Sequence, residues 1–353
     1  MKALKYFGTW DVEIADAPDL KCSAGDDIIL DIAVCGICGT DVGIISGTYP
    51  VASIGTTLGH ETCGIVTSIG DDVTLFKLGD RVVVNPTYFC GHCRMCKTGN
   101  QNHCEMKLGT EAGVSSDGAF AGQYRAKEAF LHKLDDHVSM QAASLTEPLS
   151  CAITGIDKLA IMNNNIRAAV IGAGPMGMLY FWLLRNKGIN VFIVEKNPQR
   201  FSFSLKRSPA NVKIYNEFEN ALEQEYGSTN NQIDVVVDTT GILTESILPH
   251  LSPGGKLLNV GLKEKNVTLN VMNIADKSLS IIGSIDSLNN SFERAYEMIR
   301  DKIVPVDLII SHEIDFDSYQ DAFRLAGCDL IKNEIVPIDV ESCKVLIRIG
   351  AFN

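Results

Sequence analysis

The fold of this chain is decided by the stretch AAVIGAGPMG at residues 168–177. Its first four residues form a short apolar run, which predicts a buried strand, and the glycines that follow predict a tight turn into a helix. A second apolar run at residues 191–194 leads directly to Glu195. A strand, a Gly-x-Gly-x-x-Gly turn, a helix and a second strand that ends at a carboxylate are typical of a dinucleotide-binding unit.

Each glycine of this turn has a predicted role. Gly172 permits the tight turn, Gly174 lets the backbone approach a pyrophosphate, and Gly177 allows the helix to pack closely on the strand. The first turn of the helix, with Pro175 and Met176, offers free N–H groups and the positive end of the helix dipole to the phosphates.

The residues around Glu195 bear on the choice of cofactor. Its carboxylate is placed to accept hydrogen bonds from both ribose hydroxyls, which favours NAD, because a 2′-phosphate would meet a like charge. Lys196 and Arg200 next to it leave NADP as an alternative. Thr240 and Val260, at the ends of two later apolar runs, are further candidate cofactor-binding residues.

The pattern on the two sides of this unit differs. Beyond it, apolar runs at 233–237, 256–260 and 279–282 alternate with helical stretches, which indicates a parallel sheet covered on both faces. Residues 1 to about 150 instead contain short β-type runs separated by glycine, which favours a barrel-like or partly open β domain. After residue 287 we expect a helix, a run at 306–314, another helix and a last strand at 344–348.

Length and composition limit the class of protein. The 353 residues suit two domains, and 46% hydrophobic with 21% charged residues is the composition of a globular protein with large cores. The formal net charge of −12 disfavours a nucleic-acid partner. The N-terminus alternates polar and apolar residues, which argues against a signal peptide, and no apolar run predicts a membrane span. We therefore expect a cytoplasmic protein with no membrane partner.

Four of the eleven cysteines lie within fifteen residues of one another. This spacing lets one loop surround a tetrahedral zinc ion with four thiolates, a shell that leaves no position for a substrate. Two disulfides in so short a loop are the less favoured alternative in a large, unexported chain. The predicted structural zinc ligands are Cys90, Cys93, Cys96 and Cys104.

A second set of residues suits a metal site with an open position. Cys38 offers a thiolate and His60 an imidazole, and Glu61 and Glu147 are candidate oxygen ligands. Taken singly, each has an ordinary structural explanation. Together with a dinucleotide fold and a four-cysteine loop, they predict a catalytic zinc site.

The order of these motifs resembles that of the zinc-containing medium-chain alcohol dehydrogenases over essentially the whole chain. Glu61 after the histidine and the Glu-Pro-Leu-Ser run at 147–150 are similar to the sorbitol, threonine and sugar-alcohol branch. The ethanol-type branch generally has a cysteine where Glu147 stands. The resemblance is carried by the fingerprint, the cysteine loop and the runs at 36–41, 59–61, 79–82, 117–124 and 147–149.

The resemblance implies an α/β fold with two domains. A β-rich, GroES-like catalytic domain would comprise residues 1–153 and 288–353, and a Rossmann domain with a doubly wound parallel sheet would comprise residues 154–287. Relatives are commonly homodimers or homotetramers.

The resemblance also implies roles for the site residues. Cys38, His60 and Glu61 would hold the catalytic zinc, with Glu147 as a ligand or near-ligand that exchanges with water. The catalytic set is completed by Thr40, which would pass the alcohol proton outward, and Asp41, which would orient His60.

The implied activity is hydride transfer from a secondary alcohol of a polyol, sugar alcohol, sugar phosphate or cyclitol to NAD(P)⁺. Many polyol-type relatives carry a histidine near the position of Thr154, so the pocket is expected to differ from that of a sorbitol enzyme. A threonine-type amino-alcohol dehydrogenase and a non-catalytic protein that binds zinc and nucleotide are the alternatives.

Overall fold

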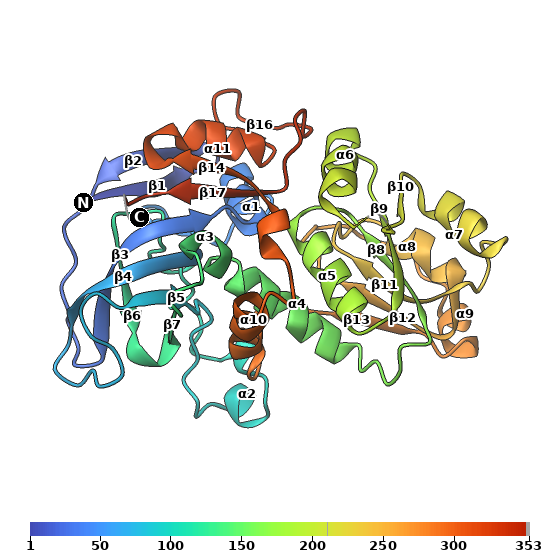
Figure 1. The fold of residues 1–353 in the computed structure, drawn as a ribbon, viewed down its shortest axis with the longest axis horizontal. Helices are drawn as coiled ribbons and strands as arrows, with labels where there is room; N and C mark the ends of the chain where they lie inside the picture. Colours follow the sequence, from blue (N-terminus) through green and yellow to red (C-terminus); the bar gives the residue numbers. More distant parts are fainter. Residues whose placement is uncertain (210, 351–353) are drawn as a thin grey trace.

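The computed structural model describes residues 1–209 and 211–350. The chain forms two sheets that lie side by side, with helices α4 (Thr146–Lys158) and α10 (Ser291–Arg300) between them (Figure 1). Across the described residues, no helix combines the length and the apolar character that crossing a bilayer requires.

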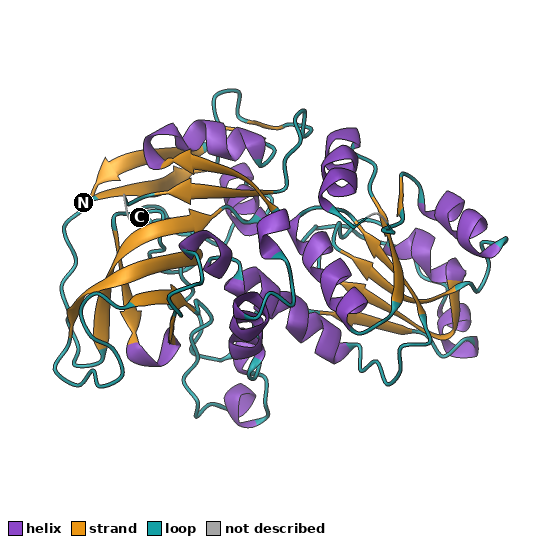
Figure 2. Ribbon diagram, in the orientation of Figure 1, coloured by secondary structure: helices purple, strands orange, loops and turns teal. Residues whose placement is uncertain are grey.

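The second sheet is wholly parallel and has the strand order β10-β9-β8-β11-β12-β13. In this doubly wound order the strands are added first on one side of β8 and then on the other. The order confirms the predicted Rossmann fold. The strands at 167–171, 190–194 and 233–238 are almost entirely buried, because helices lie on both faces of the sheet (Figure 2). They are β8 (Arg167–Ile171), β9 (Asn190–Val194), β10 (Ile214–Tyr215), β11 (Ile233–Asp238), β12 (Leu251–Asn259) and β13 (Ser280–Gly283). The helices are α5 (Pro175–Asn186), α6 (Pro198–Arg207), α7 (Phe218–Tyr226), α8 (Thr244–Ile247) and α9 (Val271–Asp276).

The first sheet takes strands from both ends of the chain, and it confirms the predicted β-rich domain. Its central strand pairs antiparallel with strands from residues 61–69, 123–127 and 344–348. Its strands are β3 (Asp27–Gly36), β4 (Glu61–Ile69), β5 (Arg81–Val84), β6 (Gln123–Lys127), β7 (Leu131–Lys133), β14 (Ile310–Asp315) and β17 (Lys344–Arg348). Short pairs are formed by β1 (Lys2–Gly8) with β2 (Asp11–Asp16), and by β15 (Cys328–Asp329) with β16 (Glu334–Ile335). The short helices α1 (Gly39–Ser46), α2 (Arg94–Lys97), α3 (Met140–Ala143) and α11 (Tyr319–Leu325) complete this half.

The two halves are joined through α4, which packs against both α5 and α10. At its far end Asp157 accepts two hydrogen bonds from the Arg294 guanidinium, at 2.5 and 3.2 Å. The predicted domain boundaries after residues 153 and 287 stay a prediction. Strands β8 to β13 all lie between them, and α4 runs continuously through the first.

Candidate active site

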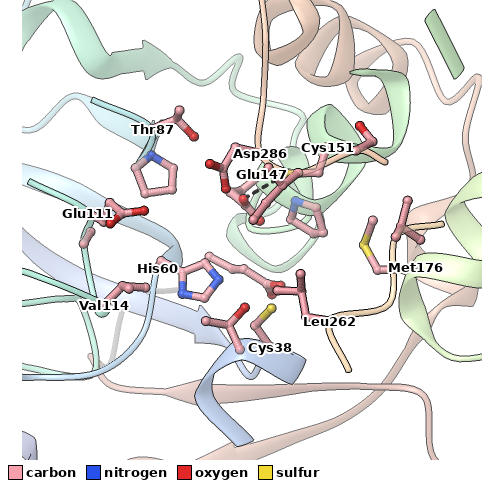
Figure 3. Close-up of a pocket in the computed structure, with 18 of the residues that line it drawn as sticks. Cys38, His60, Thr87, Glu111, Val114, Glu147, Cys151, Met176, Leu262 and Asp286 are labelled. Atoms are coloured by element: carbon pink, nitrogen blue, oxygen red, sulfur yellow. Dashed lines mark hydrogen bonds between the residues drawn. The ribbon is translucent and has the colours of Figure 1, made fainter. Parts of the chain in front are cut away.

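The predicted ligands Cys38, His60 and Glu61 meet where two neighbouring strands end. Residue Gly36 of β3 pairs with Glu61 of β4, so the residues that follow β3 and precede β4 lie together. Cys38 is the N-cap of α1, and one ligand atom from each of the three residues lies within 4.8 Å of the other two. Figure 3 shows the Cys38 thiol beside the His60 imidazole.

The buried carboxylate of Asp41 fastens the two ligand-bearing segments together. Its Oδ2 accepts a hydrogen bond from the Cys38 amide at 2.8 Å, and its Oδ1 accepts one from the Gly59 amide at 3.2 Å. The distance from Asp41 Oδ1 to His60 Nδ1 is 4.0 Å, which is too long for a hydrogen bond. Asp41 therefore positions His60 through the main chain.

Lys344, which the sequence analysis did not identify, forms a buried ion pair with Glu61. It is the first residue of β17, and its Nζ also donates to the Ile37 carbonyl at 2.8 Å. Burial acts to lower the pKa of Lys344, but its interactions with Glu61, Cys38 and Glu147 together outweigh burial and raise the pKa, so the ammonium is retained. The available signal was a lysine that opens the apolar run 344–347, where a surface charge is not expected.

Glu147 lies in the first turn of α4 and lines the same pocket as the three grouped residues. Its Oε1 accepts a hydrogen bond from the Cys151 thiol, one helical turn later, at 3.2 Å. Burial raises the pKa of Glu147 to about 7, and the nearby His60 acts in the opposite direction. Glu147 is therefore able to exchange a proton near neutral pH. Cys151 and Tyr180, which also line the pocket, were missed by the sequence analysis because each is an isolated residue without a motif.

Thr40 lines the pocket next to Cys38. Thr154 was expected to affect the shape of the pocket, but it is not among the described residues that line the pocket and instead lies at the contact between α4 and α10. Its hydroxyl accepts a hydrogen bond from the Leu288 amide at 3.0 Å and donates to the Ser150 carbonyl, also at 3.0 Å. The residue at position 154 thus fixes the turn before α10, so the absence of histidine there bears on packing between α4 and α10.

The four cysteines of the predicted structural site form a second group, with their sulfurs within 4.8 Å of one another. Main-chain amides point at these sulfurs: Cys93 N lies 3.3 Å from Cys90 Sγ, and Cys96 N lies 3.4 Å from Cys93 Sγ. Such donors stabilise thiolates, and the Cys96 amide is the main cause that lowers the pKa of Cys93 to about 6. Four convergent sulfurs with amide support suit a tetrahedral zinc ion.

The glycine-rich turn has the geometry that the sequence predicts. Gly172 has a φ of +93°, a value that glycine adopts without strain. A Cβ on Gly177 would lie 1.8 Å from the Gly172 carbonyl oxygen, so only glycine fits there. Gly174 caps the N-terminus of α5, and Pro175 and Met176 form the first turn of that helix.

The Glu195 carboxylate is fixed beside this turn. Its Oε2 accepts a hydrogen bond from the Ala173 amide and its Oε1 accepts one from the Asn197 amide, both at 2.7 Å. Arg200 reaches the same turn, because a Cβ on Gly174 would lie 3.6 Å from Arg200 Nη1. Lys196 instead points to solvent and pairs with Glu217 at 3.5 Å.

The other two cofactor candidates lie at the carboxyl edge of the parallel sheet. Thr240 donates its hydroxyl to Asp238 Oδ1 at 2.6 Å, just after β11. Val260 follows β12 and lines the pocket together with Met176 and Leu262. The pocket therefore extends from the Cys38 and His60 side to the glycine-rich half of the molecule (Figure 3).

The donor set fits a zinc ion with an open position. Thiolate, imidazole and carboxylate are ordinary zinc ligands, and three of them leave room for an exchangeable fourth. His60 Nδ1 is buried and has no hydrogen-bond partner among the described residues, as expected of a nitrogen that a metal ion would satisfy.

Comparison with protein families covers most of the chain. The model of the alcohol dehydrogenase GroES-like domain matches residues 24–136, and the model of the glucose dehydrogenase C-terminus matches residues 140–336. Together these two matches include every strand of the parallel sheet and every strand of the first sheet except β17.

Three known proteins illustrate the range of similarity. Sorbitol dehydrogenase of Bacillus subtilis (strain 168) is 30% identical, over 96% of this chain and 97% of that protein. D-arabitol-phosphate dehydrogenase of Enterococcus avium is 26% identical, over 89% and 88%. The crystal structure of an alcohol dehydrogenase from Escherichia coli CFT073, complexed with NADH, has a TM-score of 0.86 and 24% identity, and the match covers 99% of each chain.

Proposed function

The chain belongs to the zinc-containing medium-chain alcohol dehydrogenases, in the sugar-alcohol branch, and on that premise we propose that it oxidises a secondary alcohol of a polyhydroxy compound by hydride transfer to NAD⁺. The observation that carries this proposal is the convergence of Cys38, His60 and Glu61 on one side of a pocket that reaches Met176 and Val260 on the other. The side with Cys38, His60 and Glu61 is the proposed metal site. The side with Met176 and Val260 is the proposed nicotinamide site.

We propose that Cys38, His60 and Glu61 hold the catalytic zinc and that the four cysteines at 90–104 hold a structural one. When bound, the catalytic zinc acts as a Lewis acid that lowers the pKa of the alcohol hydroxyl. Glu147, whose pKa is raised to about 7, would be a ligand or near-ligand of this zinc that exchanges with water. Asp41 holds the loops of Cys38 and His60 at their spacing.

Other pocket residues would transfer the alcohol proton or exclude water. Thr40 lines the pocket together with Cys38, and its hydroxyl would pass the alcohol proton outward. Met176, Val260 and Leu262 give the pocket an apolar wall at the end nearest the glycine-rich turn. Such a wall keeps water from the carbon that loses its hydride.

We propose NAD as the cofactor in preference to NADP. Gly172, Gly174, Pro175, Met176 and Gly177 would hold the pyrophosphate, with Thr240 and Val260 farther along the same edge of the sheet. The support is Glu195, whose carboxylate is held by two amides at 2.7 Å and cannot turn away from a 2′-phosphate without losing both bonds. Lys196 lies at the surface, where it pairs with Glu217.

A substrate panel tests the proposal. Purified protein is assayed with D-sorbitol, D-arabitol, galactitol, L-threonine and ethanol, each with NAD⁺ and with NADP⁺, before and after removal of metal. We expect oxidation of polyols with NAD⁺, loss of activity on chelation, and two zinc ions per chain. Faster oxidation of L-threonine than of every polyol would support the threonine-type alternative, and no oxidation at all would reject the proposal.

A homodimer or homotetramer and a cytoplasmic location complete the proposal. The oligomeric state is proposed from the relatives, and the location is proposed from the sequence.

A further inference from the structure

Three charged side chains form one wall of the pocket, away from the proposed zinc ligands. Lys107 Nζ lies 2.8 Å from Glu111 Oε1 and also bonds to Asp286, which comes from a segment 179 residues further along the chain. The three side chains retain 16%, 27% and 25% of their exposure, so they face the pocket and are only partly hydrated. Figure 3 shows Glu111 and Asp286 bordering the same cavity as His60 and Glu147.

The charge of the pocket lining is strongly asymmetric. Among the described residues, Lys107 is the only lysine or arginine in the lining, and it already pairs with two carboxylates. Glu61 and Glu147 add two more acidic groups. The ammonium nearest to Glu61 belongs to Lys344, which is buried behind the pocket and is occupied by Glu61. Glu61 is therefore paired, and the excess acidic charge at the wall comes from Glu111 and Asp286, which share one ammonium. An anionic group of a substrate bound at the wall would meet a carboxylate that has no counter-charge of its own.

The wall is also held in place from behind. Asp286 has a φ of +56°, an uncommon conformation that persists only where neighbouring contacts enforce it. The preceding carbonyl of Ile285 accepts a hydrogen bond from Asn102 Nδ2 at 3.0 Å. The following residue, Ser287, lies 3.4 Å from Asn85 Oδ1 through its hydroxyl. A wall fixed at three consecutive residues presents its carboxylate at a defined place, as recognition of a particular hydroxyl requires.

We propose that Lys107, Glu111 and Asp286 are the specificity-determining wall of the substrate site. They would bind the distal hydroxyls of a polyhydroxy alcohol that carries no anionic group and would reject the phosphate esters of such alcohols. This inference rests on the proposed function and narrows it. Similarity does not decide the point, because the relatives include enzymes named for a free polyol and for a polyol phosphate.

The chemistry of the wall supports hydroxyl recognition. A hydroxyl group both donates and accepts, so it can bridge a carboxylate of Asp286 or Glu111 and the ammonium of Lys107 without breaking their pairing. A phosphate would have to draw Lys107 away, which would leave two partly buried carboxylates without their partner. Tyr49 lines the same part of the pocket and offers a neutral phenol.

The test compares matched substrates: D-arabitol with a D-arabitol phosphate and galactitol with galactitol 1-phosphate, each with NAD⁺. We expect the free polyol of at least one pair to have a kcat/KM at least about tenfold above that of its phosphate, a ratio worth about 1.4 kcal/mol. The variant Asp286→Asn should shrink this ratio severalfold, because it frees Lys107 for the phosphate. The matched control Asp276→Asn removes an equal charge at an exposed position at the end of α9 and should leave the ratio unchanged.

The outcomes separate the two proposals. A phosphate ester oxidised as well as its free polyol, or an Asp286→Asn ratio equal to that of the Asp276→Asn control, overturns the inference and leaves the proposed dehydrogenase activity standing. If no alcohol is oxidised with either nucleotide, the proposed function falls and takes the inference with it. Should Asp286→Asn fail to fold, as judged by circular dichroism, Glu111→Gln removes the other carboxylate partner of Lys107 and poses the same question.

Discussion

At the scale of single residues, the site depends on charges that are buried in pairs. Glu61 and Lys344 each retain only 2% of their side-chain exposure, and Lys344 is joined to the end of β3 through the Ile37 carbonyl. A buried charge without a partner is strongly unfavourable, so each member of this pair requires the other. The pair links the proposed ligand Glu61 to a strand from the far end of the sequence.

Removing one member of this pair tests its role. In metal-free protein, Lys344→Met should lower the free energy of unfolding by about 3–5 kcal/mol, because Glu61 is left as a buried, unpaired charge. Lys344→Met combined with Glu61→Gln should recover most of that loss. Urea unfolding measures both. The control is Lys2→Met, which breaks the exposed pair with Asp317 and should cost at most about 1 kcal/mol. A single variant as stable as the double variant would refute this account.

The glycine-rich turn provides a second test at this scale. Gly177→Ala should destabilise the protein by about 1–3 kcal/mol, because its Cβ would lie 1.8 Å from a backbone oxygen. Gly174→Ala has its nearest neighbour at 3.6 Å, so the fold should tolerate it, and only NADH binding should weaken. Thermal unfolding and fluorescence titration with NADH distinguish the two. Equal stability of the two variants would contradict the argument from close packing.

At the scale of elements, β3 positions the site, because Cys38 follows its last residue. The opposite end of β3 begins at Asp27. Asp27 is 1% exposed and accepts hydrogen bonds from Ser23 N at 2.6 Å and from Ala24 N at 2.8 Å. Its Oδ1 also lies 2.9 Å from Lys127 Nζ on the adjacent β6. One carboxylate therefore fixes the start of the strand and its pairing with a neighbour.

This anchor predicts how stability depends on pH. Burial acts to raise the pKa of Asp27, but Lys127 and the donors of Ser23 and Ala24 outweigh it and lower the pKa well below its ordinary value. The stabilisation is therefore complete above about pH 4 and is lost as the pH falls through the lowered pKa. Asp27→Asn should cost about 2–3 kcal/mol at pH 7 and flatten the fall in stability between pH 5 and pH 3.

The control for this prediction is Asp26→Asn. Asp26 is the exposed neighbour and pairs with the same lysine at 2.5 Å. Urea unfolding at several pH values measures both variants. If the free energy of unfolding of Asp27→Asn fell as steeply between pH 5 and pH 3 as that of the unchanged protein, the carboxylate would not anchor β3 in this way.

At the scale of the whole molecule, the four-cysteine loop reaches the half that contains the parallel sheet. Asn102 and Lys107, on either side of Cys104, bond to Ile285 and Asp286, which come just after β13. The loop thus connects the two halves along the pocket wall, in addition to the packing of α4 against α5 and α10. The proposed structural zinc is therefore expected to act on the substrate site from a distance.

Loss of this zinc should be visible in substrate binding. Cys104→Ser should reduce the zinc content from two ions to one per chain and raise the KM for the alcohol about tenfold, with a smaller change in kcat, because the wall at 285–286 loses its support. Metal analysis and steady-state kinetics measure the two effects. The control is Cys22→Ser, a half-buried cysteine outside both groups. An unchanged KM in a one-zinc protein would show that the loop and the pocket are independent.

The sequence by itself determined the class of fold. The 168–177 stretch, the apolar runs that follow it and the order of the motifs were sufficient, because strand burial and glycine conformation are set by residues close together in the chain. They also identified the two candidate ligand groups: the four cysteines lie together, and Cys38, His60 and Glu61 lie together, while Glu147 lines the same pocket outside that group. The four-cysteine loop is a local motif, whereas Cys38 meets His60 and Glu61 because β3 pairs with β4.

Only the tertiary structure decided what surrounds those residues. Lys344 meets Glu61 and Lys107 meets Asp286 across 283 and 179 residues of sequence, and neither pair has a motif. Thr154 is likewise placed by its contact with the turn before α10. The partner of a buried charge depends on which distant strands and loops fold beside it, and spacing along the chain does not encode that.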